Sequence, residues 1–199
     1  MAKPQMNDFD IIRQQLSRRL PPLENLKIEP ERGRQAAVSI TLRNHDGRAE
    51  LLVIQRAENP RDHWSGHLAL PGGRADAVDA DLIATAARET HEEVGIDLLS
   101  GGSFIGRLQT LAPKNPRLPQ IEITPLVALA PPQFSLQLNQ EVAAAFWIAV
   151  GELKRQGRAS FFNWLVDGIE RQWPAYPSER GPIWGLTERI LTDFLTLLD

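Results

Sequence analysis

The sequence lacks cysteine entirely and holds only two methionines and one tyrosine among its 199 residues. Without cysteine, disulfide bonds and thiolate metal sites are excluded. No apolar run approaches the roughly 20 residues that a membrane-spanning helix requires, and the charged first ten residues do not contain the apolar stretch of a secretory signal. Basic residues do not outnumber acidic ones, 22 against 25, so the chain has no electrostatic footprint for a nucleic-acid polymer. We therefore expect a cytoplasmic protein that binds neither a membrane nor a nucleic-acid polymer.

The remaining composition is that of a globular domain, with 42% hydrophobic and 24% charged residues. A chain of this length can bury a core without disulfide bonds or structural metals. Apolar residues recur at helical spacing over residues 8–20, directly before two prolines, which predicts an amphipathic helix. We assign residues 1–34 to this helix and a polar connector, and residues 35–199 to a single domain.

Strands and helices alternate along the rest of the chain, which predicts an α/β fold with a mixed β-sheet. Two β-rich runs flank the turn residues 44–47, so we predict a hairpin there. The irregular stretch 57–73 contains three glycines, and loops of such length are usually functional. The expected elements are strands at 36–43, 50–56, 104–111, 122–129, 143–148 and 160–166, and helices from 79 or 81 to 94, at 150–156 and at 184–198.

The segment 88–96 carries the most informative pattern, Arg-Glu-Thr-His-Glu-Glu-Val-Gly-Ile. Glu89, Glu92 and Glu93 stand at i, i+3 and i+4, so their side chains share one helical face. Like charges at this spacing destabilise a helix by roughly 0.2–0.5 kcal/mol per pair, and the helix dipole disfavours them further near the C-terminal end. Arg88 cannot neutralise all three carboxylates, whereas a divalent cation could.

Oxygen-only ligands favour Mg²⁺ or Mn²⁺ over Zn²⁺. A zinc site is disfavoured because His63, His67 and His91 do not provide a ligand pair on a helix. A solvated acidic face would also explain the three glutamates on their own. The upstream turn of residues 70–74, Leu-Pro-Gly-Gly-Arg, argues against that alternative, because glycines let the backbone approach a ligand closely.

Gly73, residues 88–93 and Gly95-Ile96 together resemble the Nudix box, the signature of the Nudix hydrolase superfamily. Thr90 departs mildly from the box, since an aliphatic residue is usual at that position. Ala80 departs further, because the general box has a glutamate there. This departure agrees with the coenzyme A pyrophosphatase branch, whose aspartate-rich box is similar to residues 72–81.

The resemblance implies the Nudix fold for residues 35–199, a mixed β-sheet between helices in an α/β/α arrangement. It also implies metal-dependent hydrolysis of a pyrophosphate bond in a nucleoside-diphosphate-linked small molecule, with Mg²⁺ or Mn²⁺ as cofactor. Coenzyme A or an acyl derivative is the expected substrate, and nucleoside triphosphates, nucleotide sugars and dinucleotides are the alternatives. A non-catalytic nucleotide-sensing module is disfavoured because every box glutamate is present. A homodimer is one assembly to be considered.

The resemblance assigns roles to single residues as well. Arg88 is expected to bridge the glutamates and the glycine loop. Glu141, which precedes the strand at 143–148, is expected to act as a further base or ligand, with Glu122 as the alternative. The expected metal ligands are Glu89, Glu92, Glu93 and the carbonyl group of Gly73.

Substrate binding is expected from side chains around the glycine loop. Arginine can hold a phosphate through two parallel hydrogen bonds, and Trp64 could either stack on a base or anchor the loop. Trp147, Trp164 and Trp184 are expected in the core. The residues assigned to the substrate are Arg56, Arg61, Trp64 and Arg74.

Overall fold

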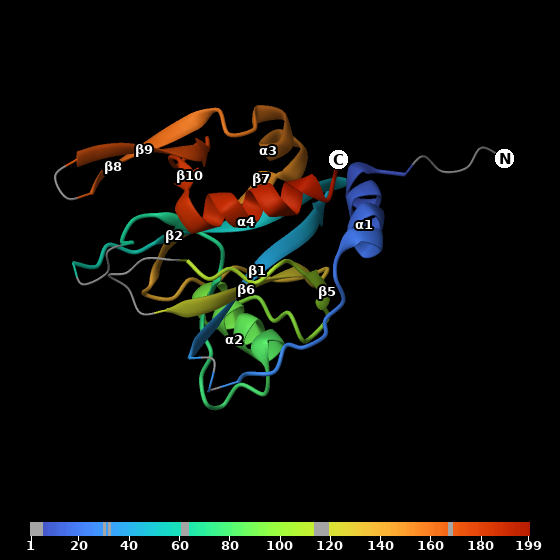
Figure 1. Ribbon diagram of the computed structural model, residues 1–199. Coiled ribbons are helices and arrows are strands. Elements are labelled where there is room, and N and C mark those ends of the chain that lie inside the picture. The colour runs from blue at the N-terminus through green and yellow to red at the C-terminus, as the bar shows by residue number, and fades with distance from the viewer. Residues whose placement is uncertain (1–5, 30, 32, 61–63, 114–119, 167–168) are drawn as a thin grey trace.

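The computed structural model describes residues 6–29, 31, 33–60, 64–113, 120–166 and 169–199, and it gives the backbone alone for residues 165, 166 and 169. A seven-stranded mixed sheet lies at the centre of the molecule, with α2 on one face and α4 on the other (Figure 1). The helices are α1 (Asp8–Arg19), α2 (Leu82–Val94), α3 (Val150–Gln156) and α4 (Gly185–Thr196).

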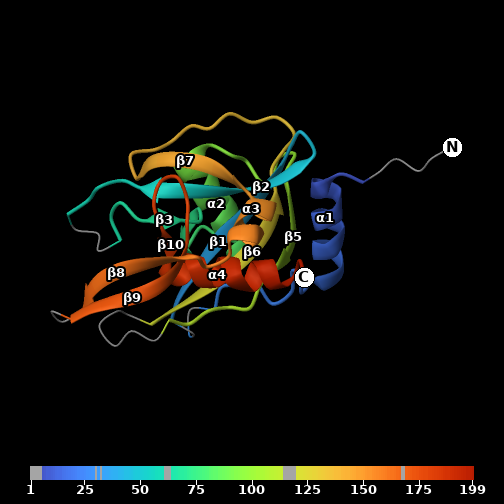
Figure 2. The same cartoon turned by 90° about the horizontal axis from the view of Figure 1, so that it is seen from above.

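The central sheet has the strand order β3-β2-β1-β6-β5, with β4 paired to β1 and β7 paired to β2. Only β1 and β6 run parallel among these pairs of the described chain, and the others are antiparallel. A second sheet has the order β10-β9-β8, and its two longer strands extend to one side of the molecule (Figure 2). The strands are β1 (Arg34–His45), β2 (Arg48–Arg56), β3 (Leu68–Ala69), β4 (Gly72–Arg74), β5 (Ser103–Arg107), β6 (Ile121–Leu129), β7 (Val142–Ala149), β8 (Ser160–Val166), β9 (Ile169–Tyr176) and β10 (Ile183–Trp184).

The predicted hairpin is confirmed as β1 and β2, joined by Asp46 and Gly47. Both residues have positive φ angles, 50° and 82°, which is the geometry of a two-residue turn that matches the twist of the strands. The side chain of Asn44 accepts a hydrogen bond from the Gly47 N–H at 2.8 Å. Alternate residues of β2 then face opposite sides of the sheet: Leu51 packs towards α1 and α4, and Leu52 packs towards α2.

The amphipathic helix predicted over residues 8–20 is confirmed as α1. Asn7 caps it by accepting a hydrogen bond from the Asp10 N–H, and Ile12 and Leu16 are buried. The connector after α1, predicted to be polar, is partly buried. Leu26 is buried beside Leu82, because the connector crosses the N-terminal end of α2, where the Leu82 N–H donates to the Leu26 carbonyl.

Three regions differ from the predicted strands. The strand predicted over 104–111 ends at Arg107, because the register with β6 shifts near Gly106, and Leu111 forms only an isolated bridge with Ile123. The stretch 57–73, predicted to be irregular, contains β3 and the start of β4, and the strands β9 and β10 were not predicted either. Pro174 interrupts the β pattern of β9, and prolines normally argue against a strand.

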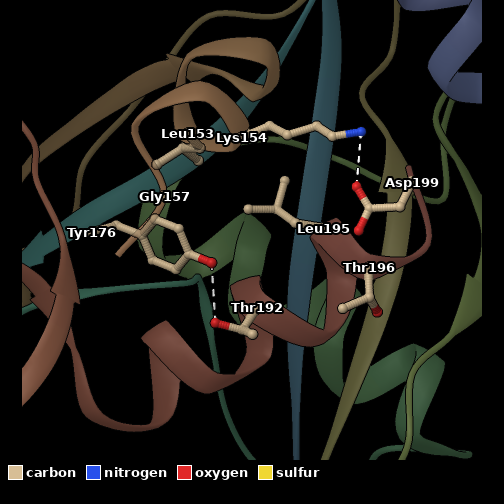
Figure 3. Close-up of a pocket in the computed structure, with 8 residues that line it drawn as sticks. All are labelled: Leu153, Lys154, Gly157, Tyr176, Thr192, Leu195, Thr196 and Asp199. Carbon is tan, nitrogen blue, oxygen red and sulfur yellow. Dashed lines mark hydrogen bonds and ion pairs between the residues drawn. The ribbon is translucent and has the colours of Figure 1, made fainter. Parts of the chain in front are cut away.

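The C-terminal helix α4 closes the face of the sheet opposite α2. Lys154 forms an ion pair with Asp199 at 3.0 Å, and the Tyr176 hydroxyl lies 3.0 Å from that of Thr192, around a small pocket (Figure 3). These polar groups bind one another and join α3, β9 and α4. Within the described residues, no helix is long and apolar enough to cross a membrane.

Candidate active site

The glycine turn, residues 70–74, contacts the C-terminal half of α2. It is held there because β4 pairs with β1. Gly72 and Gly73 stand opposite Val38 and Ala37 in this pairing, and the Ser39 N–H donates to the Pro71 carbonyl. Gly72 has a φ of 148°, and a Cβ atom there would lie 2.6 Å from the Val38 Cα. Only glycine fits this position without moving the strand.

Glu93 is buried, and one of its carboxylate oxygens accepts a hydrogen bond from the Gly72 N–H at 2.9 Å. Burial raises the pKa of Glu93 from 4.5 to about 7, against the lowering effect of that hydrogen bond. The charges of Glu89 and Glu141 raise this pKa further, and the charge of Arg56 lowers it.

Glu89 lies one helical turn before Glu93 and rests against the second glycine. A Cβ atom on Gly73 would lie 2.5 Å from the carboxyl carbon of Glu89, so the carboxylate occupies the space that a side chain would need. Burial raises the pKa of Glu89, and the neighbouring Arg88 opposes that shift. The absence of a side chain at Gly73 therefore allows the acidic face of α2 to meet the backbone of β4.

Arg88 has the bridging position that the sequence predicted. Its guanidinium group contacts the Glu89 and Glu92 carboxylates, each at 3.0 Å, and donates to the Arg74 carbonyl at 3.0 Å. Its remaining contact, a bidentate ion pair with Asp79 at 2.9 and 3.0 Å, was not predicted.

Asp79 was not among the site residues that the sequence indicated, yet the structure places it against Arg88. Its side chain is only 3% exposed, and the hydrogen bond from Arg88 lowers its pKa from 3.8 to about 2. A carboxylate is therefore present next to Ala80, the position at which the box departs from its general form. The run of aspartates in residues 76–81 was the available signal, but spacing alone did not distinguish Asp79 from Asp81, which caps α2.

Glu92 behaves differently from the other two glutamates, because its side chain is 53% exposed and pairs with Arg88. The three carboxylates share a helical face, as predicted, but they do not converge on one point. Among the residues that the structure describes, no three acidic or histidine side chains are grouped closely enough to hold a metal ion as they stand.

The donor set nevertheless fits a hard divalent cation. Glu89 and Glu93 offer carboxylate oxygens beside the backbone of Gly72 and Gly73, and the chain has no cysteine to provide a thiolate ligand. The negative charge of Glu89 raises the pKa of Glu93, and a bound cation would lower that pKa instead.

Thr90, the unusual polar residue of the box, has a structural explanation. Its hydroxyl is fully buried, donates to the Ala86 carbonyl at 2.7 Å and lies 2.7 Å from the Ser39 hydroxyl. Thr41 donates to Ser39 in turn at 3.0 Å. These hydrogen bonds connect α2 to β1, so the aliphatic contact usual at this position is replaced by a satisfied polar one.

Glu141 and Arg56 are brought next to the carboxylates by the pairing of β7 with β2. The Ala57 N–H donates to the Glu141 carbonyl at 2.8 Å, and the charges of Glu141 and Arg56 both act on Glu93. Arg74 is exposed and contributes its carbonyl to Arg88, while Glu122 is half-buried in β6. Arg61 and His63 lie outside the described residues.

The prediction that Trp147, Trp164 and Trp184 are core residues is wrong in part, because all three are only partly buried. Trp147 packs partly against the core and lies below the Arg43 guanidinium at 4.4 Å. Trp164 and Trp184 are half-buried, because β8 and β10 belong to the second sheet and reach beyond the core. Both rings contact Trp64, which is itself 44% exposed.

The sequence matches one protein family and relatives that share its description. The family described as NUDIX domain matches residues 33–165. An uncharacterized Nudix hydrolase NudL of Enterobacter sp. (strain 638) is 33% identical over 162 residues, which are 80% of each chain. A relative with the same description from Yersinia enterocolitica is 35% identical over 142 residues, 71% of this chain and 70% of that one.

Solved structures show the same arrangement of sheet and helices. A MutT/nudix family protein from Enterococcus faecalis has a TM-score of 0.55 at 18% identity, covering 94% of this chain and 73% of its own. A C. elegans Ap4A hydrolase in a binary complex has a TM-score of 0.51 at 22% identity, covering 61% of this chain and 84% of its own. At these identities the similarity concerns the fold, and it confirms the predicted α/β/α arrangement.

Proposed function

Because the chain belongs to the Nudix hydrolase family, whose members hydrolyse pyrophosphate bonds, we propose that it is a divalent-cation-dependent pyrophosphatase acting on a nucleoside-diphosphate-linked small molecule. The observation that carries this proposal is the contact of Glu89 and Glu93 with the Gly72-Gly73 backbone. A solvated acidic face would not hold one carboxylate buried and another against a glycine that has no room for a side chain.

Glu89 and Glu93 are the proposed principal ligands of Mg²⁺ or Mn²⁺, with Glu92 and the Gly73 carbonyl as the remaining candidates. When bound, the cation neutralises the charge of the diphosphate bridge and helps to orient the attacking water. Glu92 would have to exchange its ion pair with Arg88 for this role, and its exposed side chain has the freedom to do so.

The positioning of Glu89 depends on Arg88 and Asp79. Asp79 holds the guanidinium through two hydrogen bonds, and the guanidinium holds Glu89 and Glu92 on one side of the helix. Arg88 is thereby fully engaged within the protein, so we assign it to positioning and not to the substrate.

Glu141 is proposed as the residue that accepts a proton from the attacking water. It is exposed at the start of β7, and its charge acts on both Glu89 and Glu93. Arg56 lies on the neighbouring strand and is the proposed contact for a substrate phosphate, with the exposed Arg74 as a second.

The proposed substrate is coenzyme A or one of its acyl derivatives. The support comes from the sequence of residues 72–81, which resembles the box of that branch, and from Asp79, which anchors Arg88 in place of the usual glutamate. Nucleoside triphosphates, nucleotide sugars and dinucleotides are the competing substrates.

A substrate panel tests the proposal directly. Purified protein is incubated with coenzyme A, acetyl-coenzyme A, a nucleoside triphosphate, a nucleotide sugar and a diadenosine polyphosphate, each with Mg²⁺ and with excess EDTA. We expect coenzyme A compounds to be cleaved to a phosphorylated pantetheine and a nucleotide only with Mg²⁺. Full turnover in EDTA would remove the metal-dependent mechanism, and preference for another substrate would remove the assignment to coenzyme A.

A further inference from the structure

Five rings from three separate segments gather beside the candidate active site, and we call them the aromatic cluster. Two come from the segment between β2 and β3, two from β8 and one from β10. All five side chains are half-buried or exposed, so the cluster lies outside the hydrophobic core. Its members are Trp64, His67, Phe162, Trp164 and Trp184.

The rings pack against one another in stacked, tilted and edge-on pairs. Phe162 and Trp184 are nearly parallel, with ring centroids 4.2 Å apart, and Trp164 lies 5.5 Å from Trp184. The edge of His67 meets these rings at 5.1–5.4 Å. Trp64 stacks over Trp164 at 6.3 Å with an angle of 21° between the planes.

Trp64 therefore forms a planar, supported surface that remains 44% exposed. Large exposed aromatic surfaces are unfavourable in water and commonly mark a binding site. Because the ring is held from behind by Trp164 and at its edge by His67, a flat ligand could stack on it without ordering a mobile side chain.

Backbone hydrogen bonds link the segment that carries two rings of the aromatic cluster to the end of β2 and to Glu141. The Arg56 N–H donates to the His67 carbonyl at 3.0 Å, and the next residue, Ala57, donates to the Glu141 carbonyl. The Glu141 N–H donates to the Asn139 side chain at 2.9 Å, and the Asn139 N–H donates to the Glu93 carbonyl at 3.2 Å. Strand β10 contacts β3 and lies beside it in Figure 2, so the second sheet borders the same end of β2.

We propose that the aromatic cluster is the nucleobase subsite of this enzyme, with Trp64 stacking on the base while its diphosphate lies at the carboxylates. This inference rests on the proposed function, since it presumes a nucleotide substrate. A base is favoured over a flexible acyl chain because the exposed surface is planar and rigid. It is favoured over a second copy of the chain because His67 of the cluster is hydrogen-bonded to the backbone of Arg56, the proposed phosphate contact.

Binding of two fragments tests the inference without depending on turnover. The affinities of AMP and of ribose 5-phosphate, which lacks the base, are measured by calorimetry with Mg²⁺ present. We expect AMP to bind the unaltered protein roughly 10- to 100-fold more tightly, in line with base stacking on an aromatic side chain. Trp64→Leu should remove most of this difference and leave ribose 5-phosphate unaffected, whereas Trp64→Phe should retain most of it.

Phe161→Leu is the matched control. Phe161 is 61% exposed on β8 and precedes Phe162, so its side chain points to the opposite face of the strand. It should leave both affinities unchanged. Equal binding of AMP and ribose 5-phosphate to the unaltered protein would overturn the inference, as would an equal loss in Trp64→Leu and Phe161→Leu. A change in sedimentation of Trp64→Leu with unchanged AMP affinity would instead indicate a contact between copies of the chain, and would also overturn it.

The two proposals fail separately. Base-dependent AMP binding without hydrolysis of any compound in the panel would contradict the pyrophosphatase and leave the base subsite in place. Metal-dependent hydrolysis with no preference for AMP over ribose 5-phosphate would contradict the base subsite alone.

Discussion

At the scale of single residues, the fold shifts the pKa values of Glu93 and Asp79 in opposite directions. Glu93 is a buried carboxyl group whose pKa rises to about 7, so the folded protein resists its ionisation. Asp79 is held by Arg88, and its pKa falls to about 2, so the folded protein favours its ionisation. The first destabilises the metal-free fold at neutral pH and the second stabilises it.

Without metal, Glu93→Gln should stabilise the protein at pH 8. A pKa raised from 4.5 to about 7 lowers the free energy of unfolding as the pH rises through that range, by about 3 kcal/mol in order of magnitude. The glutamine removes this dependence. Urea unfolding in EDTA at pH 4.5 and pH 8 measures it, with the exposed Glu92→Gln as control. A variant no more stable than the original protein at pH 8 would contradict the assigned burial.

Asp79→Asn should have the opposite effect at neutral pH. A pKa lowered from 3.8 to about 2 stabilises the fold above about pH 4, and this contribution disappears as the pH falls towards 2. We expect the variant to lose about 2 kcal/mol at pH 7 and to show less acid sensitivity between pH 4 and 2.

Asp81→Asn is the control for Asp79→Asn, because asparagine caps a helix as well as aspartate does. It should leave the free energy of unfolding nearly unchanged. Equal effects of the two substitutions, measured by urea unfolding at pH 7, would show that the ion pair with Arg88 does not stabilise the fold.

At the scale of elements, the site is the meeting of α2 with β4. The pairing of β4 with β1 fixes the two glycines, and the hydroxyl network of Thr90, Ser39 and Thr41 fixes α2 over β1. The face of α2 that carries Glu89 and Glu93 is thereby held against the Gly72 N–H group and the backbone of Gly73.

Gly73→Ala should lower kcat by roughly tenfold or more, the effect of misplacing a catalytic group. The new Cβ atom would lie 2.5 Å from the Glu89 carboxyl carbon and would push that side chain aside. Steady-state kinetics with coenzyme A measure the loss. Gly151→Ala is the control, since a Cβ atom there meets nothing within 4 Å. If both variants retain full activity, the contact between Gly73 and Glu89 is not part of the site.

Helix α2 and the β1–β2 hairpin could be predicted because their signals are local: a 3.6-residue period, an aspartate cap, a following glycine and an Asp-Gly turn. Spacing also placed the three glutamates on one face. Residue spacing could not show that Glu93 is buried while Glu92 is exposed. The burial of Glu93 depends on contact with β4, a separate segment that precedes α2 in the chain. The choice of Asp79 as the partner of Arg88 depends on the same long-range packing.

At the scale of the whole molecule, the central sheet brings the end of β2, the start of β7 and the helix α2 together. Strands β8 and β10 supply three rings of the aromatic cluster, which contact Trp64 and His67 from the segment between β2 and β3. The sequence predicted the tryptophans as core residues because large aromatic side chains are usually buried. Their actual position follows from the second sheet, two of whose strands had no recognisable pattern.

Binding of a divalent cation should stabilise the whole fold, by an amount that grows with the logarithm of the cation concentration once the site is filled. At a concentration 100 times the dissociation constant, the gain is about 2.7 kcal/mol for one site that exists only in the folded state. Thermal unfolding of the protein at pH 8 with increasing Mg²⁺ measures this gain, and Glu93→Gln should reduce it strongly. An unchanged melting temperature across the titration would contradict a site formed by the folded α2 and β4.

The most direct test of the central claim is the turnover of Glu93→Gln at saturating Mg²⁺. The substitution keeps the size of the side chain and removes one anionic oxygen. Metal stabilisation of the transition state amounts to several kcal/mol, so we expect kcat to fall by roughly 10²–10⁴ while the variant is at least as stable as the original protein in EDTA. Turnover close to that of the original protein would contradict the assignment of Glu93, and with it a metal-dependent pyrophosphatase built on this face of α2.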